Sequence, residues 1–136
     1  MKKILFIEDE AALQRAMTQA VQEAGYTVFS ALDGEIGIRL AEKEMPDLIL
    51  CDLILPKKHG FEVLKEIKKD ARLKTIPIVL LTTSSTETEI ENGYKLGANS
   101  FVIKPLNFKE FTGKVKDIQR YWMWTNTLPP PRHHAL

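Results

Sequence analysis

Short apolar runs alternate with longer segments of helical periodicity along most of the chain. Five runs have the length and composition of buried strands, at residues 4–7, 27–30, 48–51, 76–81 and 100–103. The segments between and after them carry apolar residues three or four positions apart, and Gly or Pro residues mark their ends. This alternation predicts an α/β fold: a doubly wound, five-stranded parallel sheet with helices on both faces.

The third run, residues 48–51, has no polar alternation, as is typical of a central strand that is buried on both faces. Asp52 follows this run directly, and Pro56 and Gly60 prevent its continuation. Open α/β sheets bind their ligands at the carboxyl ends of their strands. We therefore expect Asp52 to lie in a ligand-binding crevice.

Composition narrows the function classes. The 136 residues are 44% hydrophobic and 27% charged, as in one ordinary globular domain. The 19 basic and 18 acidic residues give a net charge of +1, which argues against direct DNA binding and against an anionic membrane partner. The single cysteine excludes an internal disulfide, and the first apolar run is too short for a signal peptide or a membrane span. A cytoplasmic location is predicted.

Polar and charged side chains follow four of the five predicted strands. Glu8 and Asp9 follow the first, Asp52 the third, Thr82 the fourth and Lys104 the fifth. These strand ends meet in one crevice of a doubly wound sheet. Three carboxylates there would repel one another unless they share a divalent cation, for which Mg²⁺ is the natural candidate.

These residues resemble the signature of bacterial response-regulator receiver domains, of the type found in chemotaxis and two-component signalling. The matching features are the acidic pair Glu8 and Asp9, Asp52 with Pro56 and Gly60 four and eight positions later, Thr82, and Lys104 with Pro105. The resemblance covers residues 2 to about 120. It implies the flavodoxin-like receiver fold with strand order 2-1-3-4-5. We expect a receiver domain over residues 1–121 and an aromatic and Pro-rich tail over residues 122–136, with no output domain.

The resemblance implies a stand-alone response regulator of a two-component or phosphorelay system. A sensor histidine kinase or a phosphotransfer protein would donate a phosphoryl group from a phosphohistidine to Asp52. Glu8, Asp9, Asp52 and the backbone carbonyl of Ile54 would hold Mg²⁺. The chain would catalyse only its own aspartyl phosphorylation and dephosphorylation, which makes it a signalling protein rather than an enzyme.

Three further residues would carry the signal away from Asp52. Lys104 and the Thr82 hydroxyl would each bind one phosphoryl oxygen. Phe101 stands at the family's switch aromatic, and its ring would turn inward as Thr82 moves toward the phosphate. The changed surface would lie on the fourth helix, the fifth strand and the fifth helix. A downstream protein target would bind there and, in a homodimer, so would a second copy.

Some positions depart from the usual receiver pattern. Ile54 gives a hydrolytic water no polar partner, and Ser84 flanks the same path, so we expect slow self-dephosphorylation. The loop at 57–59 reads Lys-Lys-His, which is unusually basic and bears on the choice of partner. The histidine of this loop, together with His133 and His134, has no partner at metal-ligand spacing, and all three are predicted to be solvated.

Other functions of this fold fit the residues less well. An FMN-binding flavodoxin would need a hydroxyl- and Gly-rich loop where three acids stand at 8–10, and a Rossmann dehydrogenase would need a G-x-G-x-x-G motif. A phosphatase with an Asp nucleophile would commonly carry a second Asp at position 54. One alternative stays open, a receiver-like module that binds its partners without phosphorylation.

Four large side chains are consecutive near the end of the last helix, at residues 121–124. They cannot share one helix face. Either the tail folds back over the core, or the aromatics extend the surface of the fourth and fifth helices in a homodimer or kinase contact. Prolines at 129–131 predict that the chain from residue 125 onward is extended or disordered. Residues 118–122, with Asn126 and these prolines, resemble the tails of stand-alone receivers that serve phytochrome-type and other hybrid kinases.

Overall fold

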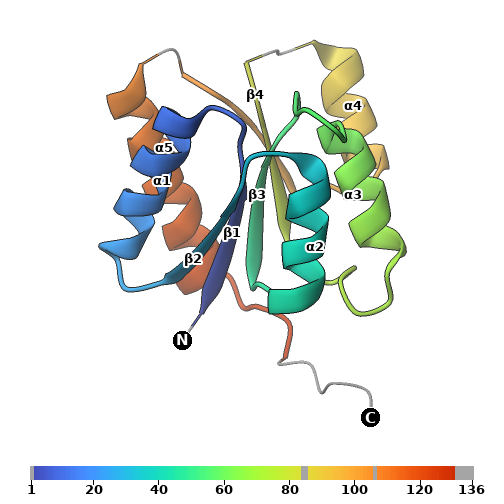
Figure 1. Ribbon diagram of the computed structural model, residues 1–136, viewed down its shortest axis with the longest axis horizontal. Helices are drawn as coiled ribbons and strands as arrows, with labels where there is room; N and C mark the ends of the chain where they lie inside the picture. The colour runs from blue at the N-terminus through green and yellow to red at the C-terminus, as the bar shows by residue number, and fades with distance from the viewer. Residues whose placement is uncertain (1, 84–85, 106, 131–136) are drawn as a thin grey trace.

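The computed structural model describes residues 2–83, 86–105 and 107–130, and it shows a sheet between two helical layers (Figure 1). Five parallel strands pair in the order β2-β1-β3-β4-β5, which confirms the predicted fold class and strand order. The strands are β1 (Lys3–Ile7), β2 (Thr27–Ala31), β3 (Leu48–Asp52), β4 (Ile78–Thr82) and β5 (Ser100–Ile103). β4 begins two residues later than predicted, because Pro77 has no N–H to donate to the ladder.

Helices cover both faces of the sheet, with α1 and α5 on one face and α2, α3 and α4 on the other (Figure 1). They are α1 (Ala11–Gln22), α2 (Gly34–Glu44), α3 (Gly60–Lys69), α4 (Glu87–Lys95) and α5 (Phe108–Arg120), and a π-helical turn, η1 (Tyr121–Thr125), continues α5. In the described part of the chain no helix is both long and apolar enough to cross a membrane.

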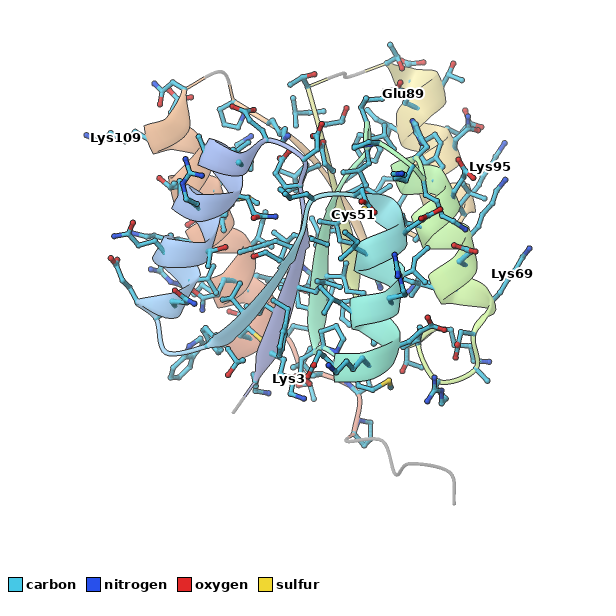
Figure 2. All side chains as sticks on the ribbon, in the orientation of Figure 1. Lys3, Cys51, Lys69, Glu89, Lys95 and Lys109 are labelled. Atoms are coloured by element: carbon cyan, nitrogen blue, oxygen red, sulfur yellow. The ribbon has the colours of Figure 1, made fainter. Side chains whose placement is uncertain are left out.

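The hydrophobic core has two halves, one on each face of the sheet. Ile49 and Leu64 belong to the half under α2 and α3, and Leu50 and Phe111 belong to the half under α1 and α5. β3 and β4 are buried along their whole length, as predicted for central strands of a parallel sheet. Cys51 is fully buried near the centre of the sheet (Figure 2), and burial raises the pKa of its thiol.

Side-chain caps mark the starts of α3 and α5, among other helices. Asn107, the N-cap of α5, accepts a hydrogen bond from the Glu110 N–H at 2.9 Å. At the start of α3, His59 Nδ1 accepts from the Phe61 N–H at 3.1 Å, and Glu62 Oε1 accepts from the His59 N–H at 3.4 Å. His59 is half-buried, so the prediction that it is solvated holds only in part. Its ring does what a Ser or Asp side chain does at most helix starts.

The turn after α5 divides the aromatic tail between core and solvent. The Asn126 N–H donates to Tyr121 O at 2.6 Å, which closes the wide turn of the π-helix. Met123 is buried in the core half of α1 and α5, and Trp122 packs partly against the same cluster. Tyr121 and Trp124 are 50% and 77% exposed. Folding back over the core is thus confirmed for Trp122 and Met123, whereas Tyr121 and Trp124 are left for other contacts.

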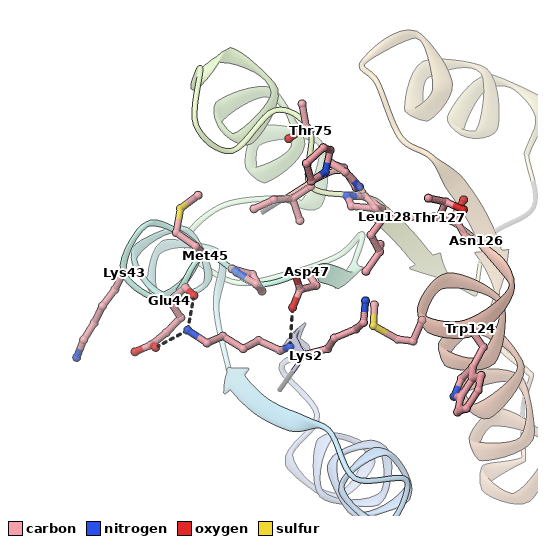
Figure 3. Close-up of a pocket in the computed structure, with 17 residues that line it drawn as sticks. Lys2, Lys43, Glu44, Met45, Asp47, Thr75, Trp124, Asn126, Thr127 and Leu128 are labelled. Carbon is pink, nitrogen blue, oxygen red and sulfur yellow. Dashed lines mark hydrogen bonds and ion pairs between the residues drawn. The ribbon is translucent and has the colours of Figure 1, made fainter. Parts of the chain in front are cut away.

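Beyond η1 the described chain is not helical, as predicted, although Thr125 itself still belongs to the π-helical turn. Residues 126–130 cross the amino-terminal edge of the sheet and line one side of an open cavity of about 740 Å³ (Figure 3). On its other side the Lys3 N–H donates to Asp47 Oδ2 at 2.8 Å, and the Lys3 ammonium donates to Glu44 O at 3.0 Å. This edge is opposite to the strand ends that carry Asp52, so the cavity is separate from the predicted crevice.

The predictions for Ser84, His133 and His134 fall outside the residues that the structure describes. The same holds for the part of the predicted tail beyond residue 130.

Met123→Ala is expected to lower the free energy of unfolding by about 2–4 kcal/mol, because it removes a buried side chain and leaves a cavity. Trp124→Ala is expected to change it by less than about 0.5 kcal/mol, because that side chain is mostly solvated. Urea unfolding followed by far-UV circular dichroism measures both. Equal losses in the two variants would contradict the division of the tail between core and solvent.

Candidate functional site

Three acidic side chains meet at the carboxyl edge of the sheet. Glu8 and Asp9 follow β1, and Asp52 is the last residue of β3. One carboxylate oxygen from each lies within 4.8 Å of the others. Glu8 and Asp52 are 1% and 7% exposed, whereas Asp9 is open to solvent. Hard oxygen ligands at this spacing, with one open side, fit a divalent cation.

Glu8 is held in place by bonds that link β1, β2 and α1. Its N–H donates to Ala31 O at 3.0 Å, at the end of β2. The Gln14 amide of α1 donates to Glu8 O at 3.3 Å and to Ala31 O at 3.0 Å. The Glu10 N–H donates to Glu8 Oε2 at 3.2 Å. Gln14 was not foreseen, because a single polar residue in the first turn of a helix carries no signal for such a bridge.

Lys104 lies between the two buried carboxylates. Its ammonium is 2.6 Å from Glu8 Oε1 and 3.2 Å from Asp52 Oδ2. The first contact is a short ion pair between two buried side chains, and it joins the end of β5 to the end of β1. The Lys104 N–H donates to Thr82 O at 2.6 Å, which joins the ends of β5 and β4.

The Phe111 ring of α5 lies next to the Lys104 ammonium. The ring is 1% exposed, and its centroid lies 5.9 Å from the Lys104 ammonium, within the range of a cation–π contact. The apolar periodicity of the last helix identifies Phe111 as a core residue, but nothing in the sequence pairs it with a lysine.

The loop between β3 and α3 explains why Pro and Gly follow Asp52 at the observed spacing. A Cβ at Gly60 would lie 2.6 Å from Asp52 O, so only glycine lets α3 begin this close to the end of β3. The Lys58 N–H donates to Pro56 O at 2.8 Å, and Lys57 between them has a φ of 69°. A side chain in this left-handed region stores strain on the order of 1 kcal/mol.

Burial raises the pKa of Glu8 to about 7; the Asp52 carboxylate adds to the rise, and Lys104 opposes it. Burial also raises the pKa of Asp52, again against the effect of Lys104. For Lys104 itself, burial lowers the pKa, but the two carboxylates outweigh it and the net shift is upward. The site thus carries more negative charge than one ammonium neutralises, which is the electrostatic setting that binds a divalent cation.

The remaining predicted site residues surround this cluster. Thr82 is 2% exposed at the end of β4, and Phe101 is half-buried on β5. The Ile54 side chain is 62% exposed in the loop after β3. Slow self-dephosphorylation stays a prediction. Its basis is that the apolar Ile54 side chain gives a hydrolytic water no polar partner. The structure brings Glu8, Asp9, Asp52 and Lys104 together at the carboxyl edge of the sheet.

The chain is similar to known proteins both in sequence and in fold. The family model described as the response regulator receiver domain matches residues 4–116. The chain is 37% identical over 136 residues to the probable methanogenesis regulatory protein FilR2 of Methanothrix harundinacea, a match that covers 94% of this chain and 88% of that protein. It spans about half the length of several transcriptional regulators that it also matches.

Two solved structures are similar over nearly their whole length. The Mn²⁺-bound form of response regulator Rcp1 has a TM-score of 0.87 and 36% identity, covering 95% of this chain and 99% of that one. Rcp1 is a protein of Synechocystis. The phosphorylated cyanobacterial phytochrome response regulator RcpA has a TM-score of 0.88 and 38% identity, covering 94% and 98%.

Without a metal ion, the protein is expected to lose stability as the pH rises from about 4.5 to about 7. The pKa of Glu8 rises from 4.5 to about 7 on folding, so the folded state binds this proton more tightly. Protonated Glu8 therefore stabilises the folded state at a pH below 4.5, and this stabilisation is lost as the pH rises toward 7. Urea unfolding in EDTA across this range measures the loss.

Glu8→Gln is the matched control, because it keeps the shape of the side chain and removes the titration. Its free energy of unfolding should depend less steeply on pH than that of the wild type over the same range. Equal slopes for the two proteins would show that Glu8 does not titrate in this window.

Proposed function

Because the chain belongs to the response regulator receiver domain family, we propose that it is a phosphorylation-dependent switch in which Asp52 accepts the phosphoryl group. One observation carries this proposal. The Asp52 carboxylate ends the central strand with the Lys104 ammonium 3.2 Å from Oδ2 and two further acids within 4.8 Å. These are the groups that phosphoryl transfer to a carboxylate needs: a nucleophile, a cation for the phosphoryl oxygens, and ligands for a metal ion.

In the proposed reaction an oxygen of Asp52 attacks the phosphorus of a phosphohistidine on a sensor histidine kinase or phosphotransfer protein. The P–N bond breaks, the imidazole keeps the electron pair and takes a proton, and an acyl phosphate remains on Asp52. Glu8, Asp9, Asp52 and the backbone carbonyl of Ile54 would hold Mg²⁺, which would neutralise charge on the transferring group. The Mn²⁺ in the Rcp1 structure supports a divalent ion at this site.

The proposed switch begins with Lys104 and Thr82. Lys104 now contacts Glu8 and Asp52, and a phosphoryl oxygen would become a further anionic partner for it. The Thr82 hydroxyl, at the adjacent strand end, would donate to a second oxygen. The movement of Thr82 would allow the Phe101 ring to turn inward, which alters the surface of α4, β5 and α5.

This surface is the proposed contact with a downstream protein. Glu87 and Glu91 are exposed on α4, whereas Lys109 and Lys116 are exposed on α5. Figure 2 shows Lys109 and Glu89 on opposite sides of the view, at the starts of these two helices. Opposite charges on the two helices also suit self-association through this face, which sedimentation at low and high salt tests.

We propose a cytoplasmic signalling protein whose only catalysis is its own phosphorylation and dephosphorylation.

The alternative of a module that binds without phosphorylation is decided by Asp52 itself. Acetyl phosphate with Mg²⁺ is expected to phosphorylate the wild type, and Asp52→Asn is expected to abolish the reaction, because an amide is not a nucleophile toward phosphorus. Intact-mass spectrometry with Mg²⁺ or EDTA measures this. A phosphorylated Asn variant, or phosphorylation in EDTA, would contradict the proposal.

Thr82→Ala and Lys104→Ala are each expected to permit some phosphorylation but to weaken its effect on α4 and β5. Moving a two-state switch from mostly off to mostly on takes roughly 5 kcal/mol. One charge-assisted hydrogen bond supplies roughly 1.5–3 kcal/mol, so both residues are needed. Amide NMR shifts on addition of beryllofluoride, a phosphoryl mimic, measure the response. A full response in either variant would mean that the signal bypasses that residue.

A further inference from the structure

Gly93 is the only buried residue of α4, all of whose residues are described. It faces Phe101 of β5. A Cβ at Gly93 would lie 2.9 Å from Cδ2 and 3.0 Å from Cε2 of the Phe101 ring, and 3.3 Å from Leu80 Cδ1. The first two distances are shorter than carbon atoms in contact normally adopt. The Phe101 ring therefore lies directly against the helix backbone, with no side chain between them.

Backbone conformation does not explain this glycine. The glycines with positive φ are Gly25 and Gly97, and Gly93 lies inside a helix. Glycine is the poorest helix former after proline, so its presence there needs another reason. Gly113 in α5 provides a comparison, because a Cβ there would meet nothing within 4 Å. The contact with Phe101 distinguishes Gly93 from Gly113, and the identity of its neighbour distinguishes it from Gly37, which lies against Ile7 of β1.

The ring also lies next to the proposed sensor residue. Leu80 of β4 pairs directly with Phe101, and Thr82 pairs with Ile103. Because side chains two residues apart point to the same face of a sheet, Leu80, Thr82 and Phe101 share the face that α4 covers. The ring thus has Thr82 as its diagonal neighbour within the sheet and Gly93 as its neighbour in the covering helix.

We propose that Gly93 is a positioning residue of the switch, and that the bare backbone of α4 at this point is the seat of the Phe101 ring in the unphosphorylated protein. The inference rests on the proposed function, in which movement of Thr82 lets the ring turn. With no side chain between them, the ring cannot leave its seat without changing the packing of α4. Gly93 therefore couples the orientation of the ring to the position of the output helix.

Gly93→Ala places a methyl group in the seat and is expected to disfavour the seated ring by about tenfold relative to the turned ring. The free-energy difference between the seated and the turned ring is then smaller. Beryllofluoride with Mg²⁺ should therefore bind more tightly, with a Kd several-fold lower than that of the wild type. Gly113→Ala adds the same methyl group to an open helix position and should leave the Kd unchanged. An unchanged or higher Kd for Gly93→Ala would overturn the inference.

A second measurement needs no phosphoryl chemistry. In the wild-type background, Gly93→Ala should lower the urea midpoint of unfolding, because the new methyl group clashes with the Phe101 ring. In a Phe101→Ala background it should raise the midpoint, because alanine is the better helix former. Gly113→Ala should raise it in both backgrounds.

If Gly93→Ala changes the urea midpoint equally in the two backgrounds, the proposed packing of the Phe101 ring against Gly93 is rejected, whatever happens at Asp52. A reversal of sign supports the seat even if beryllofluoride fails to bind the wild type, in which case the proposed function alone has failed.

Discussion

Two carboxylates buried side by side, with one ammonium between them, are the constraint on which this end of the molecule depends. Glu8 and Asp52 both contact Lys104, at 2.6 and 3.2 Å. Two like charges about 4 Å apart cost roughly 4 kcal/mol at the effective dielectric of a protein surface, and one cation offsets only part of the total for three acids. The remainder must be met by a proton, which the raised pKa of Glu8 provides near neutral pH, or by a divalent ion.

The topology of the sheet creates this constraint and also makes it tolerable. Parallel strands end at one edge, so residues far apart in the chain meet there. Besides the ion pairs of Lys104, two bridges that do not involve the carboxylates hold this edge: Gln14 joins the ends of β1 and β2, and the Lys104 N–H joins the ends of β5 and β4. Gly60 lets α3 start directly beside the end of β3. The strand ends are thus joined in part by bonds that do not depend on the charge of the acidic cluster.

Most of the fold and the membership of the site could be predicted, because both follow from periodicity and from where strands end. The apolar runs define the strands, and the acids, Thr82 and Lys104 follow them directly. Other features depend on three-dimensional contacts that no local pattern records. His59 as a helix cap, Gln14 as a bridge and the opposite fates of Met123 and Trp124 belong to this class. Gly93 is the clearest case. In the sequence it is only a poor helix former within a helix, and its contact with the Phe101 ring is apparent only in the structure.

Stability is unevenly distributed between the site and the surface that would respond to it. β3 and β4 are buried along their whole length, whereas every residue of β5 is only partly buried. α3 buries four of its residues and α4 buries one, Gly93. Elements with few buried side chains open or shift at the lowest free energy. In the proposed switch, two charge-assisted hydrogen bonds, worth roughly 3–6 kcal/mol together, would act on α4 and β5, because these bonds are small beside the packing that holds β3 and β4 in the core. A signal that began at Asp52, as proposed, would therefore meet its weakest resistance at the Phe101 ring and at α4, against which the ring packs.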